Sequence, residues 1–266
     1  MDTFLAPKRS LGQNFLTDRN ICERIVASLE LASDDPVLEI GPGRGALTRV
    51  LAAHGGPVFA LEKDTALVGW LRREYPHVGF VHADGLDFCW EGVAALPGLS
   101  LIGNLPYNVA SPMIWEMVSR CRFWKGMNFM VQKEVALRLT AASGSKAYGA
   151  LSAWVGNFAH ARYLFTVPPH VFRPKPKVDS AIVRFVPRDD PAWSEAGDLS
   201  QTLKILFQQR RKQLGTILKA WWGEELDSWC AGVKADRRIR PEELTPDELR
   251  SLARVLAAKR VNRMSE

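Results

Sequence analysis

The chain has 266 residues, of which 47% are hydrophobic and 24% are charged, and its net charge is +6. This length and composition exclude a disordered polymer and indicate a globular protein with one large α/β domain and a small appendage. The positive charge is concentrated in residues 160–188 (six basic residues against one acid) and 203–266 (fourteen against nine), which favours a polyanion partner over the alternative of a solvated basic face.

The first predicted element is an arm over residues 7–16 (PKRSLGQNFL), which is basic and irregular. Asp18 follows as the expected N-cap of a helix with apolar residues at helical spacing. A mobile tail is the ordinary expectation for a terminus. Asn14, Phe15 and Leu16 are unusual residues to leave loose beside a helix start, so we prefer an arm folded over a ligand.

A glycine loop comes next. Residues 36–45 (PVLEIGPGRG) predict a buried strand that runs into glycines, with a helix from there to residue 53. Pro42 lacks the N–H group that a pyrophosphate site would use. A second strand, residues 58–61, leads to Glu62, which stands 19 residues after the second glycine of the loop, where an acid can bind two ribose hydroxyls. The pattern favours a nucleoside without phosphates, such as S-adenosylmethionine, and NAD is the alternative.

The third and fourth predicted strands each lead into polar residues. Asp84, after the strand at residues 78–81, can accept a hydrogen bond from an adenine amino group or cap the next turn, and both readings stay open. Residues 101–108 (LIGNLPYN) bring together an amide oxygen at Asn104, a carbonyl at Leu105 with no competing N–H, and the ring of Tyr107. This combination suits a planar heterocycle with an amino group. The alternative is an ordinary strand-to-helix turn.

Regular alternation of strands and helices predicts a parallel sheet. A helix is expected to begin with Ser111 as its N-cap, and a fifth strand at residues 127–131 precedes a helix over residues 132–142. Ligand-bearing loops lie at the carboxyl ends of parallel strands. We therefore expect the polar or glycine residues that follow the first four strands to line one crevice. They are Gly41, Glu62, Asp84 and Asn104.

The next stretch predicts a helix over residues 150–159, a strand at 161–167 and a further strand at 181–186. A proline-rich loop, residues 168–180 (PPHVFRPKPKVDS), joins the two strands. A plain surface loop is one interpretation. The functional interpretation places Phe172 on the second face of a target ring and backbone phosphates near the basic residues of the loop. These are Arg173, Lys175 and Lys177.

The last part of the chain predicts a small helical domain. Residues 188–200 are acidic and irregular, as in a linker, and residues 202–222 have apolar positions at helical spacing, interrupted by QQRRKQ. A capping box at residues 245–248 opens a final helix. Arg210, Arg211 and Lys212 are candidate phosphate contacts, with a solvated helix face as the alternative.

Metal, disulfide and membrane functions are not indicated by the sequence. The four cysteines form no CxxC pair and have no His-rich neighbourhood, which fits a reducing cytosol. The start of the chain lacks the apolar core of a signal peptide, and no run approaches the roughly 20 apolar residues of a membrane span. We expect a cytoplasmic protein without a metal.

These motifs, in this order, resemble the KsgA-type small-subunit ribosomal RNA adenine dimethyltransferases over almost the whole chain. The matching stretches are PKRSLGQNFL, VLEIGPGRGALT, ALEKD, HADGLD, IGNLPYN, VQKEVALRL, YGALS, PPHVFRPKPKVDS and FQQRRKQL. The resemblance implies a Rossmann-like class I S-adenosylmethionine-dependent methyltransferase sheet, an α/β fold, with a small C-terminal all-α domain. It also implies methyl transfer to N6 of two adjacent adenosines near the 3′ end of 16S ribosomal RNA, in immature small subunits, with S-adenosylhomocysteine as product.

The resemblance assigns roles to residues of this chain. It implies a cofactor site of Asn14, Leu16, Gly41, Glu62, Asp84 and Asn104, a catalytic corner of Asn104, Leu105, Tyr107 and Phe172, and a weaker role for Glu39 beside the methionine part. Arg210, Arg211 and Lys212 match a basic segment on the RNA side. The expected parts are an arm (1–17), a catalytic domain (18–188), a linker (189–200) and a helical RNA-facing domain (201–266), in a monomer.

One departure from the family pattern affects the RNA side. Where the family usually continues with polar or basic residues after RRK, this chain has Gly215 and an apolar run that ends at Trp221 and Trp222. Two alternatives share the scaffold: a large-subunit adenine methylase of the erythromycin-resistance type, and a non-catalytic RNA-binding assembly factor. The LPY sequence after Asn104 favours the small-subunit branch.

Overall fold

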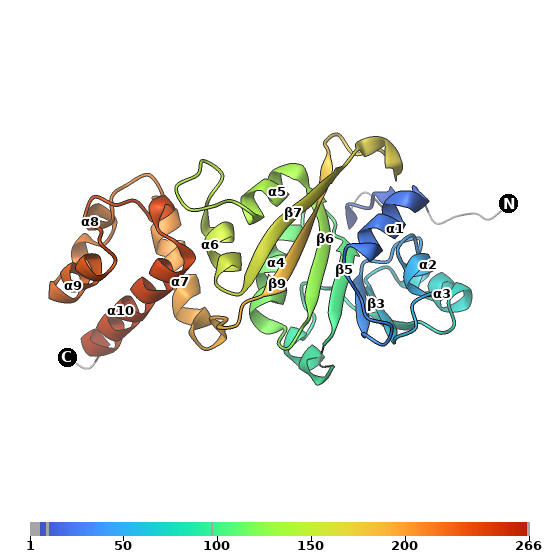
Figure 1. Cartoon of the computed structure of the whole chain (residues 1–266), viewed down its shortest axis with the longest axis horizontal. Helices are drawn as coiled ribbons and strands as arrows, with labels where there is room; N and C mark the ends of the chain where they lie inside the picture. Colours follow the sequence, from blue (N-terminus) through green and yellow to red (C-terminus); the bar gives the residue numbers. More distant parts are fainter. Residues whose placement is uncertain (1–5, 9–10, 97, 265–266) are drawn as a thin grey trace. The chain divides into compact units, whose positions relative to one another are not determined.

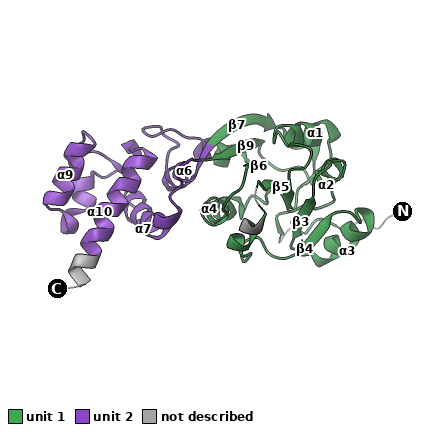
Figure 2. Ribbon diagram, turned by 60° about the horizontal axis from the view of Figure 1, so that its bottom comes forward, with its two compact units in different colours: residues 1–136, 161–187 green, residues 137–160, 188–266 purple. Residues whose placement is uncertain are grey.

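The computed structural model describes residues 6–8, 11–96 and 98–264. Parts of the predicted arm, residues 1–5, 9 and 10, lie outside the described residues. The same holds for most of the N-terminal stretch on which the signal-peptide prediction depends. The chain forms two compact units, Met1–Ala136 with Ala161–Pro187 (unit 1) and Leu137–His160 with Arg188–Glu266 (unit 2), which Figure 2 colours separately. Among the described residues, no helix combines the length and apolar character needed to span a membrane.

Unit 1 is built on a seven-stranded sheet in the order β4-β3-β2-β5-β6-β9-β7 (Figure 1). Its strands are β2 (Val37–Ile40), β3 (Val58–Glu62), β4 (Gly79–His82), β5 (Ser100–Asn104), β6 (Gly126–Gln132), β7 (Ala159–Val167) and β9 (Ser180–Pro187). The strands from β4 to β6 are parallel, and β9 pairs antiparallel with β6. The carboxyl ends of β2, β3, β4 and β5 therefore meet at one edge, as the alternation in the sequence predicted.

The helices of unit 1 connect and cover these strands. They are α1 (Arg19–Ala27), α2 (Thr48–Leu51), α3 (Thr65–Glu74), α4 (Ala110–Arg120), α5 (Lys133–Leu139, which runs into unit 2), η2 (Trp90–Ala95) and η3 (Pro169–Val171). Asp18 caps α1 as predicted, because its carboxylate accepts a hydrogen bond from the N–H of Ile21 at 3.0 Å. Ile25, Leu51 and Leu71 of α1, α2 and α3 are buried in one core with Ile102 of β5.

Two predicted helix starts were wrong. The helix expected directly after the glycine loop is shorter, since residues 43–47 form turns before α2 begins at Thr48. Ser111 was expected to cap a helix, but α4 begins at Ala110 and the N–H groups of Val109 and Ala110 donate to the Pro106 carbonyl at 3.1 and 3.0 Å. The rigid Pro106 thus starts the turn earlier than the Ser-Pro pair indicated.

A two-stranded sheet joins the arm to the proline-rich loop. Phe15–Leu16 (β1) pairs antiparallel with Phe172–Arg173 (β8). Phe15, Leu16 and Phe172 are all buried in the core of unit 1. These two segments, more than 150 residues apart in the chain, are therefore held together by backbone pairing and apolar burial.

Unit 2 is helical apart from the first two residues of β7. Its helices are α6 (Ala150–Gly156), η4 (Trp193–Glu195), α7 (Ala196–Phe207), α8 (Leu214–Ile217), η5 (Lys219–Trp221), α9 (Glu224–Gly232), η6 (Pro241–Glu243) and α10 (Pro246–Met264). The predicted capping box starts α10: the Thr245 hydroxyl accepts from the N–H of Glu248 at 3.3 Å, and Glu248 accepts from the N–H of Thr245 at 2.8 Å.

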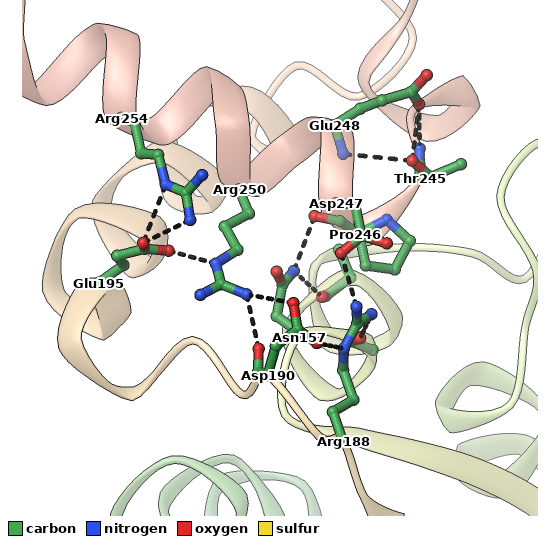
Figure 3. A network of polar contacts seen from close by, with 12 residues as sticks. Asn157, Arg188, Asp190, Glu195, Thr245, Pro246, Asp247, Glu248, Arg250 and Arg254 are labelled. Atoms are coloured by element: carbon green, nitrogen blue, oxygen red, sulfur yellow. Dashed lines mark hydrogen bonds and ion pairs between the residues drawn. The ribbon is translucent and has the colours of Figure 1, made fainter.

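The segment predicted as an irregular linker is ordered, and α7 begins inside it at Ala196. Two of its acids have arginine partners (Figure 3): Asp190 lies 3.0 Å from Arg188 and 3.2 Å from Arg250, and Glu195 pairs with Arg250 and, at 2.7 Å, with Arg254. Composition alone indicated an acidic linker, whereas the ion pairs with α10 fix its backbone.

Residues 137–160 belong to unit 2, which differs from the domain limits expected from the sequence. The ring of Tyr148 lies 6.2 Å from that of Phe207, and the N–H of Gly144 donates to the Glu242 carbonyl at 2.7 Å. These contacts tie a segment between two sheet strands to the C-terminal helices.

Candidate active site

A cavity opens at the carboxyl ends of β2, β3, β4 and β5. The empty space in it is about 950 Å³, a figure that includes open solvent at its mouth. Most of the predicted cofactor and catalytic residues line it, namely Asn14, Gly41, Glu62, Asp84, Asn104, Leu105 and Tyr107. Leu16 and Phe172 are buried in the core instead and are not among the described residues that line the cavity.

The glycine loop forms one wall of this cavity. Gly41 and Gly43 have φ values of +68° and +56°, which favour glycine. A Cβ atom built on Gly41 would have only the Asn104 carbonyl within 4 Å, at 3.9 Å, whereas one on Gly43 would lie 2.9 Å from the Phe15 ring. Gly41 thus leaves room for a ligand to approach the backbone, and Gly43 leaves room for the arm.

Glu62 ends β3 with its carboxylate held by the backbone. Its oxygens accept hydrogen bonds from the N–H of Gly43 at 3.1 Å and the N–H of Asp64 at 2.8 Å. Burial raises the pKa of this carboxyl, and the backbone donors oppose that effect. The side chain is fixed across the mouth of the glycine loop, where it can accept two ligand hydroxyls.

Glu39, in the middle of β2, is completely enclosed. The Thr48 hydroxyl donates to it at 2.6 Å, and burial raises its pKa to about 8. It is not among the described cavity-lining residues, so a direct contact with a ligand is not built into this structure.

Asp84 caps the turn that follows it, which is one of the two roles that the sequence left open. One oxygen accepts from the N–H of Leu86 at 3.0 Å and so caps the turn, while the other pairs with the Lys63 ammonium. The hydrogen bond from Lys63 lowers the pKa of Asp84. The lowered pKa keeps this carboxylate charged, and Asp84 and Lys63 both line the cavity.

Asn104 connects the fourth strand to the arm. Its Nδ2 donates to the Asn14 carbonyl at 2.8 Å, which assigns the amide so that Oδ1 is the group left for a ligand. The next N–H, of Leu105, donates to the Met130 carbonyl at 3.1 Å, and Pro106 has no N–H. Neither the N–H of Leu105 nor an N–H at position 106 therefore competes with a ligand for the Leu105 carbonyl.

Tyr107 is held by a residue that the sequence analysis missed. Its hydroxyl lies 2.6 Å from the hydroxyl of Ser180, the buried first residue of β9. Desolvation raises the pKa of Tyr107 despite this hydrogen bond. The signal for Ser180 was present at the end of the proline-rich motif, but pairing it with Tyr107 required the antiparallel β6–β9 register.

A second missed residue fastens the arm. Asp64, whose side chain is only 3% exposed, accepts from Lys8 Nζ at 2.8 Å and from Gln13 Nε2 at 3.4 Å. Burial alone would raise the pKa of Asp64, but the hydrogen bonds from Lys8 and the N–H of Ala66 outweigh it and lower the pKa. The arm is therefore tied down two residues after Glu62.

The predicted RNA-binding residues differ in their exposure and in their partners within the chain. Lys175, Lys177, Arg211 and Lys212 are exposed. Arg173 is exposed but donates to the Phe172 carbonyl at 3.1 Å. Arg210 pairs with Glu242 and donates to the Lys146 carbonyl at 2.8 Å, so it serves the structure of unit 2. Within the described part of the chain, no group of His, Cys, Asp or Glu is arranged to hold a metal.

Comparison with known sequences matches the chain to one family and to named relatives. The model of the family described as ribosomal RNA adenine dimethylase matches residues 5–255. A protein of Nitratidesulfovibrio vulgaris (strain Hildenborough) named ribosomal RNA small subunit methyltransferase A is 47% identical, with 94% of this chain and 96% of that protein covered. A protein of the same name from Chlorobium luteolum is 39% identical, with 96% and 91% covered.

Solved structures show the same fold. A dimethyladenosine transferase from Plasmodium falciparum matches with a TM-score of 0.77 and 24% identity, covering 92% of this chain and 98% of that one. The 23S rRNA methyltransferase ErmE matches with a TM-score of 0.70 and 24% identity, covering 91% and 99%. The class I methyltransferase fold predicted from the sequence is confirmed.

Proposed function

The chain belongs to the ribosomal RNA adenine dimethylase family, and from this membership we propose that it dimethylates N6 of two adjacent adenosines in the 3′-terminal hairpin loop of 16S rRNA. It is an S-adenosylmethionine-dependent rRNA adenine methyltransferase. The immature 30S subunit is the proposed substrate, and a monomer acting in the cytoplasm is the proposed form. One observation carries the proposal: residues 104–107 line the same cavity as the glycine loop, so a target base and a cofactor can meet there.

The cavity fits the cofactor that the family uses. Gly41 offers a side-chain-sized space at the backbone, Glu62 is held to accept two hydroxyls, and Asp84 can accept from an amino group. We propose that these residues hold the methionine, ribose and adenine parts, with Asn14 closing the arm above them. When bound, S-adenosylmethionine supplies an electrophilic methyl group on a sulfonium.

The protein's own contribution is to orient the target amine. The exocyclic nitrogen of adenine is a poor nucleophile because its lone pair is delocalised into the ring. Asn104 Oδ1 and the Leu105 carbonyl accept the two amine hydrogens, which draws the nitrogen toward a tetrahedral geometry and directs its lone pair at the methyl. No strong base is needed first, because the proton becomes acidic only once the nitrogen carries positive charge. Positioning and a partly negative surrounding then lower the barrier.

The base is held by stacking. Tyr107 lines the cavity and its hydroxyl is fixed by Ser180, so its ring is a ready platform, worth about 1–3 kcal/mol for one stacked base. Phe172 is 0% exposed, and its proposed role on the second face requires β8 to open when the RNA enters. The adenine leaves its own stack at a cost of a few kcal/mol, which is smaller in a loop than in a duplex.

The two alternatives from the sequence have less support. The relatives that are 39–47% identical carry the small-subunit name, while the 23S enzyme ErmE shares the fold at 24% identity. A non-catalytic assembly factor would not require the hydrogen-bonded corner around Asn104.

The test is mass mapping of adenosines in 16S and 23S rRNA after incubation of immature 30S and 50S particles with the protein and S-adenosylmethionine. We expect dimethyladenosine at two adjacent positions of 16S rRNA only. Asn104→Ala should still bind S-adenosylhomocysteine, with a loss of no more than about tenfold from its contact with the arm, while turnover falls at least a hundredfold, as for loss of one transition-state contact. Unmodified 16S rRNA would overturn the proposal, and retained turnover would remove Asn104 from the mechanism.

A further inference from the structure

An aromatic and a cationic side chain are fixed against each other in unit 2 by one carboxylate. Trp222, two residues before the start of α9, donates its indole N–H to Asp227 Oδ1 at 2.8 Å. Arg237 Nε lies 3.6 Å from the same oxygen, and its guanidinium carbon lies over the Trp222 ring, 4.6 Å from the centroid. The side chain of Arg237 is 60% exposed. Asp227 thus holds a guanidinium over an indole in a position that solvent can reach.

Gly215 explains how Arg237 comes to this place. The N–H groups of Leu214 and Gly215 donate to the carbonyls of Ile239 and Arg237 at 2.9 and 2.8 Å. A Cβ atom on Gly215 would lie 3.1 Å from Arg237 Cβ and 3.2 Å from its carbonyl oxygen, so a larger residue would push the two backbones apart by a few tenths of an ångström. The backbone that directly follows the basic segment 210–212 therefore lies beside residues 237–239.

Charges around this pair divide into two groups. Arg238 pairs with Asp236 at 2.9 Å, and Arg237 shares Asp227 with the indole. Arg211, Lys212 and Arg240 are exposed, and no ion pair involves them among the described residues. At the start of α9, Glu224 is exposed and Glu225 pairs with Lys259. Phosphates are therefore favoured along the two basic segments and disfavoured at the start of α9, beside the indole.

We propose that Trp222 and Arg237 form a stacking site for one unpaired base of an RNA strand whose phosphates run along Arg211, Lys212 and Arg240. Aromatic rings and guanidinium planes both stack on nucleobases, and they do so with little preference for sequence. Asp227 acts as a positioning residue, because it contacts both members of the platform. The site lies in unit 2, outside the methyl-transfer cavity, and it rests on the proposed function in that the RNA is the rRNA substrate.

The experiment measures binding of a short fluorescein-labelled single-stranded RNA and of its duplex over a range of salt concentrations. Trp222→Leu should weaken binding of the single strand by on the order of tenfold, without changing the slope of log affinity against log salt, because stacking releases no counterions. Trp222→Phe should keep most of the affinity, and Arg237→Ala should weaken the single strand as well. Trp70→Leu, which removes another half-buried indole in unit 1, is the matched control and should leave binding unchanged.

Equal affinity of wild type and Trp222→Leu would overturn the proposal, as would equal losses for single strand and duplex. If Trp222→Leu lowers the melting temperature, the single-strand affinities of Trp222→Phe and Arg237→Ala are compared instead, since both variants keep more of the packing. Retained affinity of the first with weakened affinity of the second supports the stacking site, and equal affinities overturn it. Methylation of 30S particles is measured in parallel. If wild type methylates the particles and Trp222→Leu binds the single strand as tightly as wild type, only the stacking site is rejected. If Trp222→Leu weakens single-strand binding but wild type does not methylate the particles, only the proposed function is rejected.

Discussion

At the scale of single residues, burial and hydrogen bonding set what each carboxylate of the site can do. Glu62 and Asp84 face the ligand space, while Glu39 is enclosed behind the loop with the Thr48 hydroxyl as its donor. The resemblance already gave Glu39 a weaker role than Glu62 and Asp84, and the structure shows the physical reason, since Glu39 lies within β2 behind the glycine loop. Their different exposure makes Glu62 and Asp84 ligand residues in our proposal and leaves Glu39 as a source of pH-dependent stability.

The pKa of Glu39 predicts how stability changes with pH. Burial raises it from 4.5 to about 8, so between these values the folded chain binds a proton that the unfolded chain has lost. Stability therefore falls as the pH rises through this window. Glu39→Gln keeps an acceptor for Thr48 and removes the penalty, so its melting temperature should exceed that of wild type at pH 8 by more than at pH 5. The difference corresponds to up to about 4 kcal/mol.

Thermal melts at several pH values check this expectation. The control is Glu74→Gln, which makes the same chemical change at an exposed position on α3. A gap between Glu39→Gln and wild type that stays constant from pH 5 to pH 8 would contradict the assignment of a buried, protonated Glu39.

At the scale of elements, the arm contacts three separate parts of the site. It is tied to Asp64 through Lys8, to Asn104 through the Asn14 carbonyl, and to β8 through the β1 pairing. The Arg44 guanidinium lies over the Phe15 ring at 4.6 Å from its centroid. One short segment thus contacts the glycine loop, the catalytic corner and the proline-rich loop, which supports its proposed role as a cover for the cofactor.

Lys8→Met should weaken binding of S-adenosylhomocysteine by about three- to tenfold. The pair joins a half-exposed ammonium to a buried carboxylate, so it is worth more than the roughly 0.2–1 kcal/mol of a fully exposed pair. Isothermal titration calorimetry measures the affinity. Arg19→Met breaks an exposed pair with Glu23 on α1 and serves as the matched control. If both variants bind like wild type, the arm does not cover the cofactor.

At the scale of the whole molecule, the positive charge divides between a loop of unit 1 and the helical unit 2. Within the basic segment of unit 2, Arg210 is engaged with Glu242, while Arg211 and Lys212 are exposed. The structure thereby narrows three candidate phosphate contacts to two. Long-range attraction to RNA depends on the sum of such exposed charges and is screened by salt.

Charge reversal of Arg211 and Lys212 to Glu should weaken binding of 30S particles and lower the slope of log affinity against log salt by about 2, since each lost phosphate contact removes about 0.9. Filter binding at several salt concentrations measures the slope. Reversal of Arg19 and Arg73, two exposed arginines of unit 1, changes the net charge equally and should alter the slope less. Equal slopes for the two double variants would place the RNA surface elsewhere.

The amino-acid sequence by itself determined the parallel part of the sheet, from β4 to β6, the residues at its carboxyl edge and the cofactor class. These features depend on periodicity and on motifs a few residues long, such as the glycine loop and LIGNLPYN. The capped starts of α1 and α10 were predictable for the same reason, because a cap acts within three residues. The order of motifs along the chain then identified the family.

Only the tertiary structure decided which distant residues meet. The Ser180 contact with Tyr107, the Lys8 contact with Asp64 and the burial of Phe172 join segments more than 50 residues apart. The ordered acidic segment and the place of residues 137–160 in unit 2 depend likewise on partners in the C-terminal helices. Composition and spacing describe what a segment can form locally, whereas pairing across the chain is set by packing and hydrogen bonds that exist only once the whole chain has folded.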